Sequence, residues 1–166
     1  MPRVVHRGAT VISMSSYQAT VQWQRGDAEF SGGFYSRGHS WHFDGGIEVR
    51  ASSSPQVVPP PRSVVEAVDP EEAFVVSLSS CHMLWFLSIA SSAGLIVDSY
   101  RDEAIGTLSK NEEGRLAMTK VVLRPRITWG SAEPSAAQLT ELHERAHHEC
   151  FLASSVKTEV VIEPIV

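Results

Sequence analysis

The amino-acid sequence predicts a single α+β domain, and three observations lead to that prediction. Segments with strand-like alternation occupy both ends of the chain, a long apolar helix occupies its middle, and an amphipathic helix follows later. The 166 residues, 43% of them hydrophobic, are enough for one well-buried core and too few for two. We expect residues 17–166 to form one domain. Residues 1–16 show no clear period and form either a flexible tail or an extension upstream of a start at Met14.

The longest apolar run extends from Asp69 to Gly94 and predicts a central buried helix. Asp69 can cap this helix, Pro70 suits the first helical position, and Gly94 can end it. Spacings of three and four residues predict a packed stripe along it, made of Phe74, Leu78, Cys81, Leu84, Trp85 and Ser88. Cys81 lies in the middle of this stripe. Its thiol is therefore either an inert core group or a shielded reactive group.

Short alternating segments and turn residues predict strands before and after this helix. The expected strands are residues 17–24, 40–43 and 47–51 before it, and 95–110, 115–129 and 157–166 after it. In the first of them, alternation predicts a half-buried strand. Turn residues at 111–114 predict that strands 95–110 and 115–129 form a hairpin. Pro125 weakens the hydrogen-bond ladder near the end of the second of these strands. The Pro- and Ser-rich residues 52–62 predict a surface loop.

A second helix begins at Ser135 and is expected to continue to about Ala153. Ser135 and Gln138 match the capping-box pattern, in which each residue bonds the backbone N–H of the other. The apolar stripe of this helix consists of Leu139, Leu142, Ala146, Cys150 and Ala153. Cys150 is therefore expected to face inward.

Charge and composition exclude several classes of function. The net charge of −5, without a block of Lys or Arg, argues against nucleic-acid binding. Two cysteines are too few for a disulfide-stapled secreted scaffold, and the first residues lack the apolar core of a signal peptide, so we expect a cytoplasmic protein. Residues 73–97 carry no Asp, Glu, Lys or Arg, yet their serines and His82 favour a core helix over a membrane span.

Two patterns suggest chemistry. If the two helices pack together, Cys81 and Cys150 can meet and act as a redox pair; the alternative is that both are small core residues. The second predicted helix also contains the pattern H-E-x-x-H. In it His143 and His147 have the spacing of zinc ligands, and Glu144 would be the general base. Candidates for the third zinc ligand, without a predicted position in the fold, are Glu149, Glu159 and Glu163. The alternative for these histidines is the polar flank of an amphipathic helix. His39, His42 and His82 show no ligand spacing and are expected to be hydrogen-bonded structural residues.

Four blocks of the sequence, in the same order along the chain, carry a resemblance to a known family. They are YSRGHSWHFDGG at 35–46, the segment 69–97 with its SLSSCHMLWFL core, VLRPR at 122–126, and HHECFLASSVKTEV at 147–160. Together they resemble the OsmC/Ohr family of thiol-dependent peroxidases over about residues 17–164. The sequence around Cys81 is closer to the osmotically inducible branch of that family. Because H-E-x-x-H falls in the helix where family members carry their second cysteine, the resemblance overturns the metalloprotease interpretation.

The resemblance implies a fold, a reaction and a set of site residues. The fold would be two central helices wrapped by antiparallel β-sheets in an intertwined homodimer. The reaction would be the reduction of organic hydroperoxides, and more weakly of H2O2, at Cys81, with Cys150 as the resolving cysteine. Arg37 is similar to the arginine that stabilises the thiolate, and Glu71 to the glutamate that holds that arginine. No cofactor or metal is implied.

Geometry and resemblance together suggest that the active site is shared between two chains. Ten residues of helix separate Glu71 from Cys81, about 15 Å along the axis, so a contact within one chain is hard to reach. We expect Arg37 and Glu71 of one chain to complete the Cys81 site of the other. Candidate pocket walls are Met83, Trp85, Phe86 and Phe151, with core packing as the alternative for each. A lipoyl or thioredoxin-like dithiol would be the reductant. The alternative function is a non-catalytic protein of this fold that binds a small apolar ligand.

Overall fold

The structure, a computed structural model, describes residues 14–130 and 132–165. Its helices are α1 (Pro70–Ser92) and α2 (Ala136–Glu149), followed by a short 3-10 turn, η1 (Ala153–Ser155). Its strands are β1 (Ala19–Gln22), β2 (His39–Phe43), β3 (Glu48–Ala51), β4 (Val97–Asp102), β5 (Ile105–Lys110), β6 (Leu116–Leu123), β7 (Pro125–Trp129) and β8 (Glu159–Ile162). The α+β prediction is confirmed. Most of the expected N-terminal tail, residues 1–13, lies outside the described residues, so the domain boundary stays a prediction.

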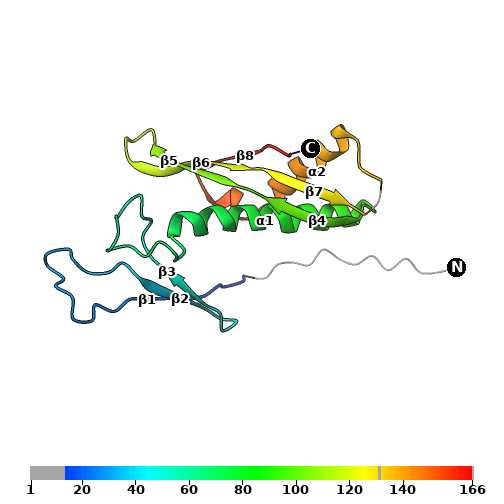
Figure 1. Cartoon of the computed structure of the whole chain (residues 1–166). Helices are drawn as coiled ribbons and strands as arrows, with labels where there is room; N and C mark the ends of the chain where they lie inside the picture. The colour runs from blue at the N-terminus through cyan, green and yellow to red at the C-terminus, as the bar shows by residue number, and fades with distance from the viewer. Residues whose placement is uncertain (1–13, 131, 166) are drawn as a thin grey trace.

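Within the described residues, three sheets accompany the two helices. The strand orders are β1-β2-β3, β4-β7 and β5-β6-β8. The pairs are antiparallel except for β6 and β8, which run parallel and place Val121 beside Val160. In Figure 1 the β4–β7 and β5–β6–β8 sheets lie on one side of α1, and the β1–β2–β3 sheet lies on the other side. Helix α1 is therefore the central element of the chain.

Helix α1 begins and ends where the sequence predicts. The Asp69 carboxylate accepts a hydrogen bond from the Glu72 backbone N–H at 2.8 Å, and the Glu72 carboxylate accepts one from the Asp69 N–H at 3.2 Å. Pro70 occupies the first helical position, where its missing N–H has no cost. Gly94, with φ of +77°, takes the left-handed conformation that ends a helix.

The buried face of α1 differs from the predicted one. The buried residues are Leu78, His82, Phe86, Ile89 and Ala90. Leu84, expected on the packed stripe, is 60% exposed, and Ser88 is also exposed. The prediction of a central buried helix therefore holds for the face that packs on α2 and the two sheets, whereas Leu84 and Ser88 are exposed in the single chain. The helix has the length and apolar composition of a membrane span, but its packing against α2 and two sheets identifies it as a core helix of the domain.

The two halves of α1 pack against different partners. In the first half, Leu78 packs against Val121 and Leu123 of the β5–β6–β8 sheet. In the second half, Phe86 packs with Leu142 of α2, alongside partly buried residues of the β4–β7 sheet. Cys81 lies between these two clusters in the sequence. The position that carries the thiol is therefore where the helix passes from one sheet to the other.

Several predicted elements are divided or shortened. Residues 95–110 form β4 and β5, and residues 115–129 form β6 and β7, because the chain changes sheet at each break. Asp102 joins the two breaks, since its carboxylate accepts hydrogen bonds from the Arg124 N–H at 2.6 Å and the Ser79 hydroxyl at 2.5 Å. The Ser135 capping box of α2 is confirmed, but the helix ends at Glu149 and not near Ala153.

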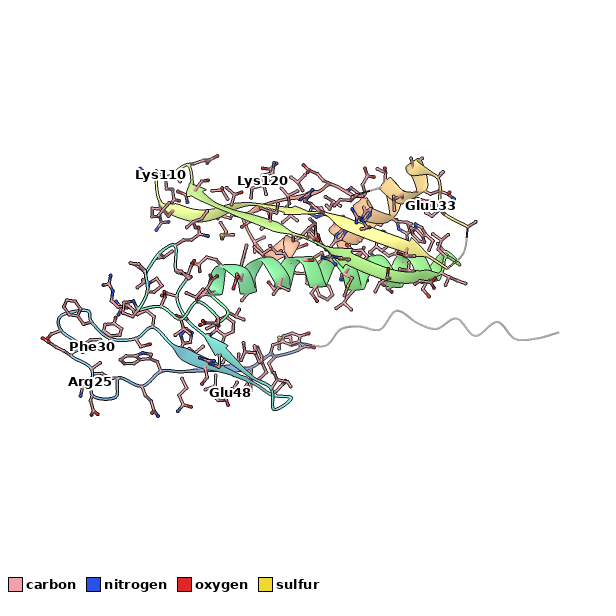
Figure 2. All side chains as sticks on the ribbon, viewed as in Figure 1. Arg25, Phe30, Glu48, Lys110, Lys120 and Glu133 are labelled. Carbon is pink, nitrogen blue, oxygen red and sulfur yellow. The ribbon has the colours of Figure 1, made fainter. Side chains whose placement is uncertain are left out.

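The β1–β2–β3 sheet and its loops form an arm. A parallel bridge between Ala51 and Val68 attaches the arm beside the start of α1. In it the Ser52 N–H donates to the Val68 carbonyl at 3.0 Å, and the Val68 N–H donates to the Arg50 carbonyl at 3.1 Å. All four residues of β1 are exposed, so the expected half-buried strand is not half-buried in the chain alone. Figure 2 shows Phe30 in the loop between β1 and β2, far from α2.

Candidate active site

The structure brings the two thiols together, although they are distant in sequence. Cys81 lies in the middle of α1, and Cys150 is the residue that caps the C-terminus of α2. Cys150 is 1% exposed, and both cysteines are free. Burial is the main cause that raises the pKa of the Cys150 thiol to about 11, and the neighbouring Cys81 thiol is the second cause. This interaction indicates that the two thiols lie close together.

The turn after α2 surrounds the Cys150 sulfur with backbone donors. The Ala153 N–H donates to Sγ at 3.4 Å, and this contact, with one from the Leu152 N–H, opposes the rise in the pKa of Cys150. Cys150 has extended backbone angles, φ −69° and ψ 108°, which turn the chain out of the helix and allow these donors to approach. Such donors stabilise a sulfur that carries negative charge.

Aromatic side chains lie beside the thiols. The Trp85 ring packs edge-on against Phe151 with 5.5 Å between ring centroids. Phe151 directly follows Cys150 and is 54% exposed, and Met83 is partly buried. Phe86 is fully buried in the core, so it does not form the wall of an open pocket in this chain. Of the four expected wall residues, Trp85 and Phe151 are the pair that the structure brings together.

Arg37 lies on the arm, in the loop before β2, and contacts its own loop. Its Nη1 donates to the Tyr35 carbonyl at 2.6 Å and to the Gly33 carbonyl at 3.1 Å. The guanidinium also lies over the Tyr35 ring, 3.6 Å from its centroid. Within the described chain no ion pair joins Arg37 to Glu71. These contacts of the Arg37 guanidinium thus all lie within its own loop.

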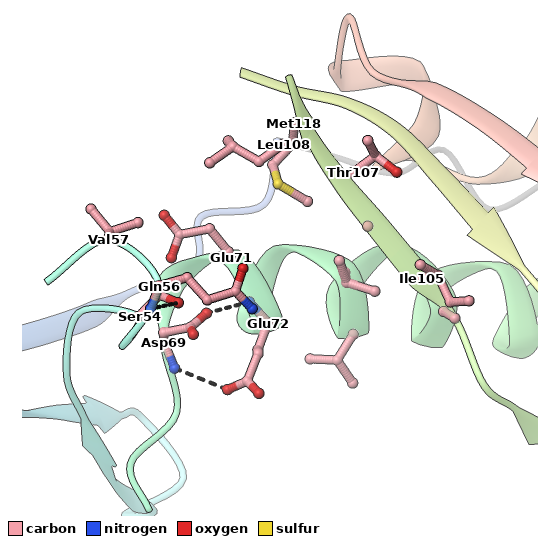
Figure 3. A pocket seen from close by; sticks show the side chains of 14 residues that line it. Ser54, Gln56, Val57, Asp69, Glu71, Glu72, Ile105, Thr107, Leu108 and Met118 are labelled. Carbon is pink, nitrogen blue, oxygen red and sulfur yellow. Dashed lines mark hydrogen bonds between the residues drawn. The ribbon is translucent and has the colours of Figure 1, made fainter. Parts of the chain in front are cut away.

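Glu71 lies in a groove at the start of α1. Figure 3 shows its carboxylate near Gln56 and Val57 of the loop before α1, with Leu108 and Met118 of β5 and β6 on the other side. The groove has a volume of about 680 Å³. Three turns of α1 separate Glu71 from Cys81. One chain therefore contains the thiol pair but does not bring Arg37 and Glu71 to it.

A buried pair of imidazoles links α1 to α2, and the sequence analysis missed it. His82 Nε2 and His143 Nδ1 lie 3.0 Å apart, and their rings are nearly parallel, with 7° between the planes. His82 is 1% exposed and His143 is 4% exposed, so His143 does not lie on a polar flank. Desolvation, together with the neighbouring imidazoles of His143 and His147, lowers the pKa of His82 to about 3. Desolvation alone lowers the pKa of His143 to about 4.

The spacing of the buried stripe could have identified His82. Leu78, His82 and Phe86 recur every four residues on the face of α1 that the core covers. The expectation that His82 is a hydrogen-bonded structural residue is confirmed. For H-E-x-x-H, the bond to His82 occupies one nitrogen of His143, and residues 14–130 and 132–165 contain no group of three or more side chains placed to hold a metal ion.

Comparisons with known proteins identify the family and agree with the fold. The family profile described as OsmC-like protein matches residues 63–164. An OsmC-like protein of unknown function from Vibrio cholerae is 54% identical over 92% of this chain and 100% of its own, with a TM-score of 0.89. No curated protein sequence matches the chain.

More distant solved structures share the fold. The organic hydroperoxide resistance protein OhrB of Bacillus subtilis has a TM-score of 0.67 at 16% identity, covering 92% of this chain and 100% of its own. An organic hydroperoxide resistance protein OsmC from Legionella pneumophila has a TM-score of 0.69 at 13% identity, covering 93% and 99%. With the family profile spanning more than half of the sequence, the chain belongs to the OsmC-like protein family.

Proposed function

We propose that this protein is a thiol-dependent peroxidase that reduces organic hydroperoxides, and H2O2 more weakly. The observation that carries the proposal is the closeness of the Cys81 and Cys150 thiols, which the effect of Cys81 on the pKa of Cys150 reflects and which a peroxidase with a resolving cysteine needs. Family membership supports it, because relatives of the same fold are described as organic hydroperoxide resistance proteins. We expect the protein to act in the cytoplasm.

The reaction has two steps on the protein. The Cys81 thiolate attacks the outer peroxide oxygen, the O–O bond breaks, and the alkoxide leaves as alcohol after taking a proton, so Cys81 becomes a sulfenic acid. The Cys150 sulfur then attacks Cys81, and the hydroxyl group leaves as water with the proton from Cys150. The products are one alcohol, one water and the Cys81–Cys150 disulfide. A lipoyl or thioredoxin-like dithiol returns both thiols by exchange and is itself oxidised to a disulfide.

We further propose that the active site is completed in a homodimer. Cys81 lies in mid-helix, where the helix dipole contributes little, so a cation must come from elsewhere. Large apolar side chains are exposed on α1 and on the arm, among them Leu84 at 60% and Phe34 at 74%. A monomer seldom leaves so much apolar surface exposed. A second copy that covers these surfaces would bring its own Arg37 and Glu71 to Cys81.

Single-turnover oxidation tests the peroxidase. The reduced protein is mixed with one equivalent of cumene hydroperoxide or of H2O2, and thiols and mass are followed in the wild type and in Cys81→Ser. We expect rapid loss of two thiols, faster with the organic peroxide and absent in the variant. Oxidation no faster than that of free cysteine would refute the proposal and turn attention to binding of a small apolar ligand.

Mixed dimers test the shared site. A subunit with Cys81→Ser is co-expressed with a subunit carrying Arg37→Ala, and the heterodimer is isolated by two affinity tags. If Arg37 acts across the interface, one intact site remains and about half of the wild-type activity returns. If Arg37 acts within its own chain, neither site is intact, and the heterodimer is as inactive as the two homodimeric variants.

A further inference from the structure

The imidazole pair joins the same two helices that carry the thiols. His82 directly follows Cys81 on α1, and His143 lies seven residues, or two turns, before Cys150 on α2. Phe86 stacks on the His143 ring with 4.5 Å between centroids, which fixes the plane of that ring. Buried apolar side chains of both helices pack beside the pair: Phe86, Ile89, Ala90, Leu142 and Ala146. The His82–His143 bond is thus a polar link among these apolar side chains.

A hydrogen bond restricts the helices in a way that apolar contacts do not. Apolar side chains keep most of their contact energy when one helix slides or rotates slightly, whereas an N–H···N bond weakens steeply with distance and angle. Single buried polar contacts set the register of paired helices in other folds, at a cost in stability. A register error of one or two ångströms would leave the thiols outside disulfide geometry.

We propose that the His82–His143 pair is a positioning device, which holds α1 and α2 in the register that places the Cys81 sulfur against the Cys150 sulfur. The two histidines are positioning residues because neither is required to touch the hydroperoxide. The inference is tested in two ways. The test with hydroperoxide rests on the proposed peroxidase function, whereas the test by thiol–disulfide equilibrium concerns only the two thiols.

The surroundings of the pair explain why it is placed at this point. His82 Nδ1 and His143 Nε2 are buried and have no hydrogen-bond partner in the described chain, and the same holds for His147 Nδ1 and the Tyr100 hydroxyl. Unpaired buried polar atoms are costly, so a chain that needed only stability would favour apolar residues here. His147 on α2 is close enough to affect the pKa of His82. Tyr100 on β4, whose pKa burial raises, packs against Phe86, which stacks on His143.

The test separates register from stability with two double variants. His82→Leu with His143→Leu fills the space and removes both imidazoles. His82→Gln with His143→Asn keeps polar atoms close to the positions of Nε2 and Nδ1. The control Leu142→Ala weakens the same helix interface without touching the bond, because Leu142 is buried there beside His143. The readouts are the free energy of unfolding in urea and the effective concentration of the two thiols against glutathione.

The free energy of unfolding of the double leucine variant is expected to equal or exceed that of the wild type. The effective concentration of its two thiols is expected to fall about tenfold, the factor that corresponds to one net hydrogen bond. The Gln/Asn variant is expected to stay near the wild-type value. Leu142→Ala is expected to lower the free energy of unfolding and to leave the effective concentration of the two thiols nearly unchanged. The inference is overturned if the double leucine variant keeps the wild-type effective concentration, or if the losses in all variants follow their free energies of unfolding.

The test with hydroperoxide distinguishes this inference from the proposed function. After one equivalent of cumene hydroperoxide, trapping with dimedone measures how long the Cys81 sulfenic acid persists. In the double leucine variant its lifetime should rise about tenfold, while its rate of formation stays unchanged. If no sulfenic acid forms even in the wild type, the peroxidase proposal fails, and the glutathione equilibrium still decides the role of the pair.

Discussion

Acidification should destabilise this protein through the two buried imidazoles. His82 and His143 have pKa values of about 3 and about 4 in the folded chain, against 6.5 for an exposed histidine. Between those values the unfolded chain binds protons that the folded chain does not bind, so stability falls as the pH falls. The loss begins near pH 6.5 and continues until the folded imidazoles themselves are protonated.

The loss of unfolding free energy between pH 7 and pH 5 depends little on the pKa values of the two imidazoles in the folded state. Both lie below 5, so each imidazole stays neutral in the folded state over this interval, while in the unfolded state it becomes almost fully protonated. Each therefore lowers the free energy of unfolding by about 2 kcal/mol, and the pair by about 4 kcal/mol. This is a large part of the stability of an ordinary domain.

Urea unfolding of the reduced protein at pH 7 and pH 5, followed by tryptophan fluorescence, measures the loss. Protein concentration is kept constant, since a dimer gains apparent stability with concentration. Carboxylates contribute their own pH dependence, so the informative quantity is the difference between wild type and the His82→Leu/His143→Leu variant. His148→Leu removes an exposed imidazole and should behave as wild type. The reasoning is wrong if the double leucine variant loses as much stability as the wild type.

Three further predictions concern single side chains. Asp69→Ala removes the N-cap of α1 and should lower the free energy of unfolding by about 1 kcal/mol in urea, with no change in thiol reactivity. Asp102→Ala leaves the Arg124 N–H and the Ser79 hydroxyl without their acceptor, and calorimetry should show a loss of about 2 kcal/mol or more. Cys150→Ser should leave the first oxidation step intact, so mass spectrometry after hydroperoxide and dimedone should find a stable adduct on Cys81.

The sequence predicts those parts of the fold that local physics determines. Asp69, Pro70 and Gly94 define the ends of α1 through hydrogen bonds and backbone angles that involve only their neighbours. Ser135 does the same for the start of α2. The divided strands could not be predicted in this way. Their break depends on Asp102, whose carboxylate bonds Arg124 twenty-two residues away, and no local pattern reveals that contact.

The candidate site was predictable in part. Apolar spacing places Cys81 and Cys150 on inward faces of their helices, and the structure brings them together. The same spacing failed for Leu84, because an all-round apolar helix gives no signal for which face the chain itself covers. His82 was missed as a linking residue because its partner, His143, is 61 residues away. The roles of Arg37 and Glu71 come from the resemblance and stay predictions.

The two cysteines differ in the backbone structure around them. This difference indicates which of the two has to move when a disulfide forms between them. The two sulfurs must approach to about 2 Å of each other to form the disulfide bond. Cys81 has more than two helical turns on each side, so α1 acts as a stiff rod at that point. Cys150 lies where α2 has already ended, on a short turn before η1. We therefore expect Cys150 to be the residue that moves when the proposed disulfide forms, and the surface of α1 around Cys81 to keep one shape in both redox states.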